Sequence, residues 1–110
     1  MAPIMGLYPE QRKQMVDQLG RMNIMSISGG RIRPIENGVE LPVSNGYLVR
    51  VELTPMDTYT VSRIFKRGGK EWIKGKPLED VYCDEVGEMA YRAGMFRSFT
   101  DKGWPSGERG

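Results

Sequence analysis

The sequence predicts an α+β fold: an N-terminal helix, an antiparallel meander of four to six short strands, and a C-terminal helix packed on the sheet. Two observations support this prediction. Apolar residues recur at spacings of three and four near both ends of the chain, and turn signals separate short Ile-, Val- and Leu-rich segments between them. The 110 residues fit a single domain, residues 1–110, in which we expect residues 1–8 and about 100–110 to be flexible.

The N-terminal helix is predicted from about Glu10 to Arg21. Pro9 stands just before it, at a position suited to the first turn of a helix, where a missing backbone N–H costs little. Gly20, near its end, is a helix-stop signal. One face of the segment is apolar and consists of Met15, Val16, Leu19 and Met22.

Four two-residue turn signals mark the meander, because Gly and Asn tolerate the positive φ angles of tight hairpin turns. They are Gly29-Gly30, Asn37-Gly38, Asn45-Gly46 and Gly68-Gly69. A hairpin turn at the first of them would place Ile27 opposite Ile32. The short segments between the turns are therefore predicted to be antiparallel strands.

Two of these segments contain a proline, Pro34 or Pro42, which cannot donate a hydrogen bond to a strand ladder. We expect both segments to be edge strands, to be bulged, or to be partly loop. The segment from Tyr47 to Thr54 alternates more regularly. It has Val49, Val51 and Leu53 on one face and Arg50 and Glu52 on the other.

The stretch RIFKRGGKEWIKGK, residues 63–76, predicts a hairpin. A two-residue loop at Gly68-Gly69 fixes the register of the two strands. The resulting pairs are Lys66 with Glu71, Phe65 with Trp72, and Ile64 with Ile73. Each pair joins opposite charges or like apolar side chains, which is favourable across two strands.

One face of this hairpin combines aromatic rings with cations. It carries Arg63, Phe65, Arg67, Lys70, Trp72 and Lys74, which form the candidate surface for a partner or a nucleic acid. Exposed rings can stack on bases while Lys and Arg contact phosphates, an arrangement that suits single strands. The alternative interpretation is structural: Phe65 and Trp72 belong to the core beneath a helix, and the cations lie at its rim.

The charge distribution bears on this choice. The net charge of +2 is too small to imply a polyanionic partner. Residues 63–76 hold six basic residues and one Glu, a net charge of +5, whereas residues 79–88 hold five acidic residues and no basic one, a net charge of −5. The acidic block could therefore neutralise the basic hairpin within the same molecule.

The C-terminal helix is predicted within CDEVGEMAYRAGMF, residues 83–96. Asp84 suits the N-cap position, and acidic residues in the first turn complement the positive end of the helix dipole. Gly87 and Gly94 each cost about 1 kcal/mol of helix stability, so this helix needs tertiary packing. Its apolar face consists of Val86, Met89, Ala90, Ala93 and Phe96.

Residues for the common kinds of catalysis are few. The chain has no His, which removes the commonest general base and a frequent metal ligand. Cys83 lies among acidic residues that oppose a thiolate, so we interpret it as a packing residue. Asp80, Asp84 and Glu88 could hold a magnesium ion, although capping and dipole interactions also explain them. We therefore predict a non-enzyme with no catalytic, cofactor-binding or metal-binding residue and no small-molecule substrate.

A reducing, cytoplasmic location is predicted from three features. The single cysteine cannot form an internal disulfide. The N-terminal MAPIMGLYPE lacks the basic start and apolar stretch of a secretory signal. No apolar run approaches the roughly 18 residues that a membrane helix needs, so we expect no membrane partner.

The chain resembles small accessory proteins of tailed phages of actinobacteria in three stretches, ISGGR, TYTVSRIFKRGGKEWIKG and VYCDEVGEMAYRAGMF. The resemblance spans most of residues 10–99 and implies an accessory protein made inside an infected cell. It carries over no catalytic or binding residue.

The leading functional hypothesis is a non-enzymatic binding protein that contacts a host macromolecule, chiefly a host protein, or associates with itself. The second is nucleic-acid binding through the hairpin of residues 63–76. The third is a metal-dependent hydrolase that uses the carboxylates of residues 79–88.

Overall fold

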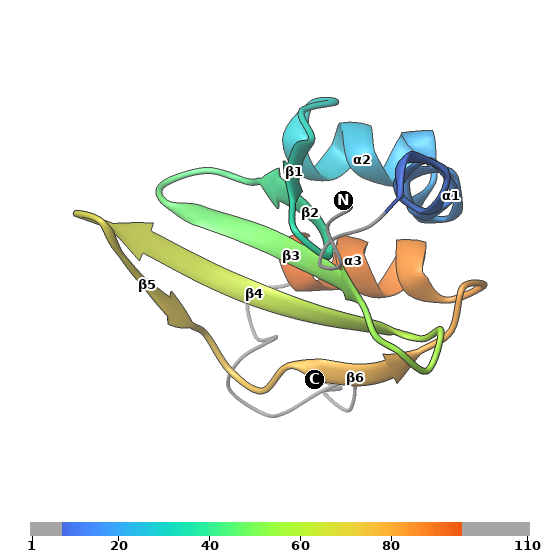
Figure 1. Ribbon diagram of the computed structural model, residues 1–110. Helices are drawn as coiled ribbons and strands as arrows, with labels where there is room; N and C mark the ends of the chain where they lie inside the picture. Colours follow the sequence, from blue (N-terminus) through green and yellow to red (C-terminus); the bar gives the residue numbers. More distant parts are fainter. Residues whose placement is uncertain (1–7, 96–110) are drawn as a thin grey trace.

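The computed structural model describes residues 8–95 and confirms the α+β class. Two helices, α1 (Pro9–Leu19) and α2 (Arg21–Ser28), precede the sheet, and α3 (Val86–Met95) follows it (Figure 1). The six strands are β1 (Arg33–Ile35), β2 (Gly38–Pro42), β3 (Tyr47–Leu53), β4 (Tyr59–Arg67), β5 (Lys70–Ile73) and β6 (Leu78–Val81). The predictions for residues 1–7, Phe96 and residues 100–110 fall outside the described residues.

The sheet is antiparallel throughout, with the order β1-β2-β3-β4-β5. Its longest strand, β4, holds β3 along one edge and two successive strands along the other. β5 pairs with the end of β4 that carries Ile64 to Arg67, and β6 pairs with the end that carries Tyr59 and Val61. The acidic segment therefore returns to the end of β4 that lies away from the β4–β5 turn (Figure 1).

The N-terminal region holds two helices rather than one. Gly20 adopts a φ of +92°, which ends α1, and the chain begins a second helix at Arg21. Gly29 closes this helix in the left-handed conformation, and its N–H donates to the carbonyl of Met25 at 2.9 Å. The predicted hairpin that pairs Ile27 with Ile32 is therefore wrong, because a Gly-Gly pair with positive φ serves a helix C-terminus as well as a hairpin turn.

The remaining turns follow the predicted signals with one shift. Asn45 and Gly46 have positive φ, as the turn prediction requires. At the β1–β2 hairpin the loop consists of residues 36 and 37, and Gly38 already pairs with Glu52 in the sheet. A Cβ on Gly38 would collide with the carbonyl oxygen of Val51, so this glycine permits a close strand approach instead of a turn.

The two prolines have different positions in the sheet. Pro34 lies in β1, which is an edge strand, as predicted. Pro42 is the last residue of β2, a strand that lies between β1 and β3. Of the alternatives expected for this second segment, the edge strand is wrong, because a proline at the end of a strand leaves the preceding ladder intact. The segment is instead partly loop, since residues 43 and 44 lie outside the strand.

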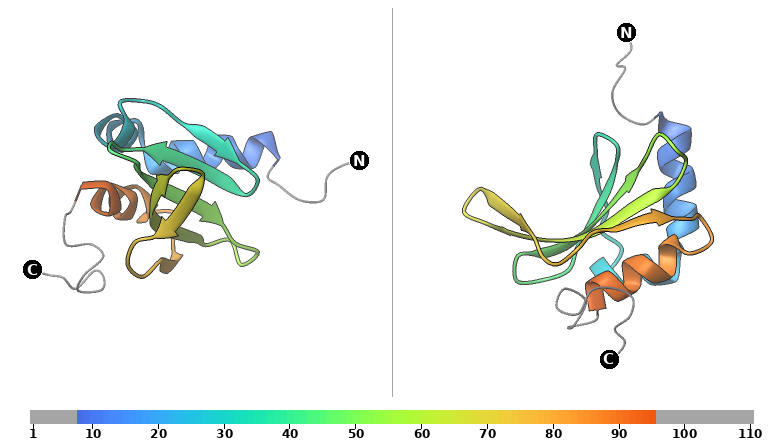
Figure 2. Two further views of the ribbon diagram at one scale, coloured as in Figure 1. Left: turned by 90° about the vertical axis from the view of Figure 1, so that its left-hand side faces the viewer. Right: turned by 90° about the horizontal axis from the view of Figure 1, so that it is seen from below.

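The three helices cover one face of the sheet and form the core with it (Figure 2). The predicted faces of β3 and α3 are confirmed where they are described: Val49, Val51, Val86, Ala90 and Ala93 are buried, and Leu53 and Met89 pack against them. No helix among residues 8–95 is long and apolar enough to cross a bilayer. The β4–β5 hairpin extends past the helical layer, as Figure 1 and the right-hand view of Figure 2 show.

Candidate functional site

The β4–β5 hairpin has the predicted register. Gly68 and Gly69 form its two-residue turn with φ angles of +60° and +82°. The facing pairs are Arg67 with Lys70, Lys66 with Glu71, Phe65 with Trp72, and Ile64 with Ile73. The main-chain bond from the Lys74 N–H to the Arg63 carbonyl, 2.8 Å long, extends the pairing by one further step.

We define the aromatic–cationic face as the six predicted surface residues together with one tyrosine from the neighbouring strand: Tyr47, Arg63, Phe65, Arg67, Lys70, Trp72 and Lys74. This face belongs to the side of the sheet that the helices cover, because Tyr47 pairs with Phe65 two residues beyond the buried Val49. Near its C-terminal end, α3 packs Gly94 over Val49. The Tyr47–Phe65 pair, two residues further along the sheet, therefore lies beyond this contact.

Three rings form a row across β3, β4 and β5. The centroids of Tyr47 and Phe65 are 4.9 Å apart, and those of Phe65 and Trp72 are 5.7 Å apart. Both pairs are tilted, an arrangement that stabilises neighbouring aromatic side chains. Trp72 is 46% exposed, whereas Phe65 and Tyr47 are half-buried. The interpretation that places both Phe65 and Trp72 in the core is therefore wrong for Trp72.

Cations lie on both sides of this row. The Arg63 guanidinium carbon is 5.1 Å from the centroid of the Tyr47 ring, within the range of a cation–π contact. Arg67 and Lys70 are exposed beside the turn, and Lys74 is half-buried. Within residues 8–95, no carboxylate forms an ion pair with Arg67, Lys70 or Lys74.

The acidic segment does not neutralise the hairpin through contacts between described residues. Its one ion pair there joins Glu88 to Arg92, 2.7 Å apart and one helical turn along α3. The strand pairing explains this separation, since β6 lies beside Tyr59 and Val61 while the basic turn lies at the other end of β4. The suggestion that the acidic block neutralises the basic hairpin is therefore wrong as far as ion pairs among residues 8–95 are concerned.

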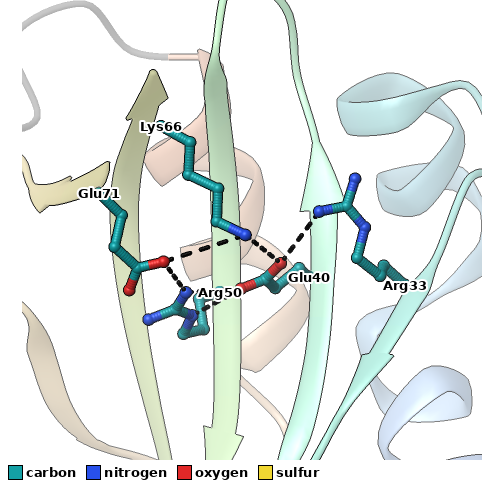
Figure 3. A network of polar contacts seen from close by, with 5 residues as sticks. All are labelled: Arg33, Glu40, Arg50, Lys66 and Glu71. Atoms are coloured by element: carbon teal, nitrogen blue, oxygen red, sulfur yellow. Dashed lines mark hydrogen bonds and ion pairs between the residues drawn. The ribbon is translucent and has the colours of Figure 1, made fainter. Parts of the chain in front are cut away.

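The opposite face of the sheet carries a charged cluster centred on Glu40, which we call the Glu40 network (Figure 3). The Arg50 guanidinium donates two hydrogen bonds to Oε2 of Glu40, at 2.8 and 2.6 Å. Arg33 and the Lys66 ammonium each approach Oε1 of Glu40 at 3.5 Å. The Glu40 side chain is only 3% exposed, so these cations enclose a buried carboxylate.

The Glu40 network also ties the hairpin to the rest of the sheet. Arg50 in β3 donates to Oε1 of Glu71 in β5 at 3.0 Å, reaching over β4. Lys66 lies 3.9 Å from the same oxygen, so the predicted Lys66–Glu71 pair is present but is the longer of the two contacts. Because the Arg50–Glu71 bond spans β4 and the Lys66–Glu40 pair spans β3, the network links strands that are not direct neighbours, on the face opposite the aromatic row.

Glu71 is expected to give this link a pH dependence. Its hydrogen bond from Arg50 holds the pKa of Glu71 below its ordinary value of 4.5. The link therefore stabilises the fold fully above about pH 4.5 and weakens as the pH falls through the folded-state pKa. Glu71→Gln should lower the free energy of unfolding at pH 7 by up to about 1 kcal/mol, since the pair is partly exposed.

Urea denaturation of both proteins at pH 7 and pH 3 measures this effect. The difference between wild type and Glu71→Gln should shrink at the lower pH. An equal difference at both values would contradict the assignment of the pH dependence to Glu71.

The described residues do not offer a metal centre. Among residues 8–95, no three Cys, Asp or Glu side chains lie so that they could hold a metal ion, and this includes Asp80, Asp84 and Glu88. Cys83 is exposed, so its interpretation as a packing residue is wrong. The hydrolase hypothesis thus has no supporting geometry in this part of the chain.

Tyr47 is the member of the aromatic–cationic face that the sequence argument missed. The alternation of β3 places Tyr47 on the same face as Val49 and Val51, but its pairing with Phe65 depends on which strand lies beside β3. The turn residues between β3 and β4 were a signal that could have supplied this pairing. No protein-family model matches the chain, and a search of solved structures finds no significant match.

Proposed function

We propose that this protein is a non-enzymatic binding protein that binds nucleic acid through the aromatic–cationic face. The observation that carries the proposal is the exposed Trp72 ring beside Arg67, Lys70 and Lys74, none of which forms an ion pair with a carboxylate among residues 8–95. A solvated cationic surface is common, but a row of three rings on the same surface is not needed for solubility. The resemblance to phage accessory proteins implies synthesis inside an infected cell, where nucleic acid is at hand.

The cations supply affinity that does not depend on base sequence. Each phosphate neutralised by Lys or Arg releases counterions, so the logarithm of the binding constant falls linearly with the logarithm of the salt concentration. Arg67 and Lys70 face each other beside the hairpin turn and are both exposed. They are therefore the two cations that a polyanion reaches with the least rearrangement.

The double variant Arg67→Gln/Lys70→Gln is expected to bind a fluorescent 12-nucleotide strand about tenfold more weakly at 50 mM salt. Its salt dependence should also be shallower, by a slope of about 1.4 for two lost contacts with a single strand. Fluorescence anisotropy titrations between 50 and 300 mM salt measure both quantities.

The matched control is Lys13→Gln/Arg21→Gln, which removes the same charge from exposed positions on the helices. It should retain nearly the wild-type affinity and slope. Equal weakening by both double variants would show that only net charge matters, and no binding by wild type at low salt would exclude the function.

A further inference from the structure

We infer that the nucleic acid taken by this face is a single strand that lies along the β4–β5 hairpin, with one or two of its bases stacked on the ring row. This inference rests on the proposed function and deepens it by naming the form of the ligand. It depends on the order of residues along the hairpin, on the accessibility of the rings, and on the contrast between the two hairpin faces.

Cations and rings alternate along the hairpin. Residues two apart on a strand share a face of the sheet. On this face the cross-strand pairs are, in order toward the turn, Arg63 with Lys74, Phe65 with Trp72, and Arg67 with Lys70. Successive pairs are about 7 Å apart, which separates the two cation pairs by about 13 Å. A strand laid along this direction can put a base over the rings and a phosphate near each cation pair, with a footprint of about two to three nucleotides.

The rings are accessible to unpaired bases. Trp72 presents the largest exposed aromatic surface of the row, and the half-buried Phe65 and Tyr47 support it from one side. An open depression adjoins Phe65 and is lined by Asn45, Gly46, Phe65, Lys66 and Arg67. Stacking needs a free base face, which paired bases inside a duplex do not offer.

The other face of the hairpin offers no comparable surface. Lys66 there lies near the carboxylates of Glu40 and Glu71, and Ile64 is fully buried. Its charges are thus balanced within the protein, as part of the Glu40 network. Arg67, Lys70 and Lys74, which form no ion pair among residues 8–95, therefore direct a nucleic-acid strand to the face that carries Trp72.

The test compares oligothymidine of eight nucleotides, the matching uridine RNA, and a duplex of the same length. Wild type should bind at least one single strand about tenfold more tightly than the duplex at 100 mM salt. Trp72→Leu should lose about tenfold for the single strand and little for the duplex, because it removes the stacking ring and keeps the cations. Trp72→Tyr, which retains a ring, should recover most of the affinity.

Tyr82→Leu is the matched control, since it removes an exposed ring directly after β6, the strand that pairs with the end of β4 away from the β4–β5 turn. Circular dichroism and melting curves establish that each variant is folded. Equal affinity for duplex and single strand, or a Trp72→Leu variant that binds like wild type, would overturn the inference. If Arg67→Gln/Lys70→Gln still weakened binding in that case, the proposed function would stand, whereas absent binding to all three ligands would remove both.

Discussion

Replacing Glu40 by alanine is expected to lower the free energy of unfolding by about 3 kcal/mol. The Glu40 carboxylate is almost fully buried and accepts two hydrogen bonds from Arg50, with Arg33 and Lys66 close to its second oxygen. Its removal leaves three cations facing one another without their central anion. This loss lies at the lower end of the range expected for breaking a buried ion pair, because Arg50 keeps its bond to Glu71 and the other two cations are partly exposed.

Urea denaturation followed by circular dichroism measures this loss. Glu88→Ala is the matched control: that side chain is 60% exposed, and its pair with Arg92 should contribute only about 0.3 to 0.5 kcal/mol. The double variant Glu40→Leu/Arg50→Met should cost less than Glu40→Ala alone, since it removes both buried charges together. A Glu40→Ala protein as stable as Glu88→Ala would show that the Glu40 network contributes nothing to stability.

The Glu40 network marks a limit of sequence reasoning. The register of the β4–β5 hairpin follows from a local rule, because a two-residue glycine turn fixes which residues face each other. The contacts of Glu40 depend on the registers of three further hairpins, β1–β2, β2–β3 and β3–β4, which must all be correct at once. Glu40 itself stands two residues before a proline, in a segment whose pattern indicated an edge strand or loop, and nothing local distinguishes it from a solvated glutamate.

The exposure of Trp72 depends on element lengths that the sequence partly specifies. A ten-residue helix such as α3 is about 15 Å long, whereas the nine residues of β4 span about 30 Å. A single helix of this length covers about half of the strand, and the rest must be covered by something else or remain accessible. The missing information was the position of α3 along β4, which its packing over Val49 determines.

The glycines of α3 show the same contrast between local cost and tertiary role. The sequence indicates only that Gly87 and Gly94 weaken an isolated helix. In the fold, Gly87 packs against the last residue of α1, Leu19, whose carbonyl oxygen accepts a 2.8 Å hydrogen bond from Asn23 Nδ2. A Cβ at Gly87 would collide with that oxygen and lie 2.7 Å from the Asn23 nitrogen.

Gly87→Ala is therefore expected to lower the free energy of unfolding by about 2 kcal/mol, although alanine by itself favours a helix by about 1 kcal/mol. The collision involves main-chain atoms, so relief requires that α1 and α3 move apart and open the core between them. Chemical denaturation of the purified variant at pH 7 measures the change.

Gly94→Ala separates the packing effect from helix propensity, because it makes the same substitution in the same helix. Its added Cβ would lie 3.2 Å from a Val49 methyl and 3.3 Å from an Ile27 methyl, both side-chain atoms that can shift slightly. The propensity gain and the tighter contact should nearly cancel there, giving a change within about 0.5 kcal/mol. If both variants proved equally stable, the close approach of α1 and α3 at Gly87 would not be a requirement of the fold. A large loss at Gly87 alone would instead show that this glycine is needed for the contact between the two helices rather than for its backbone flexibility.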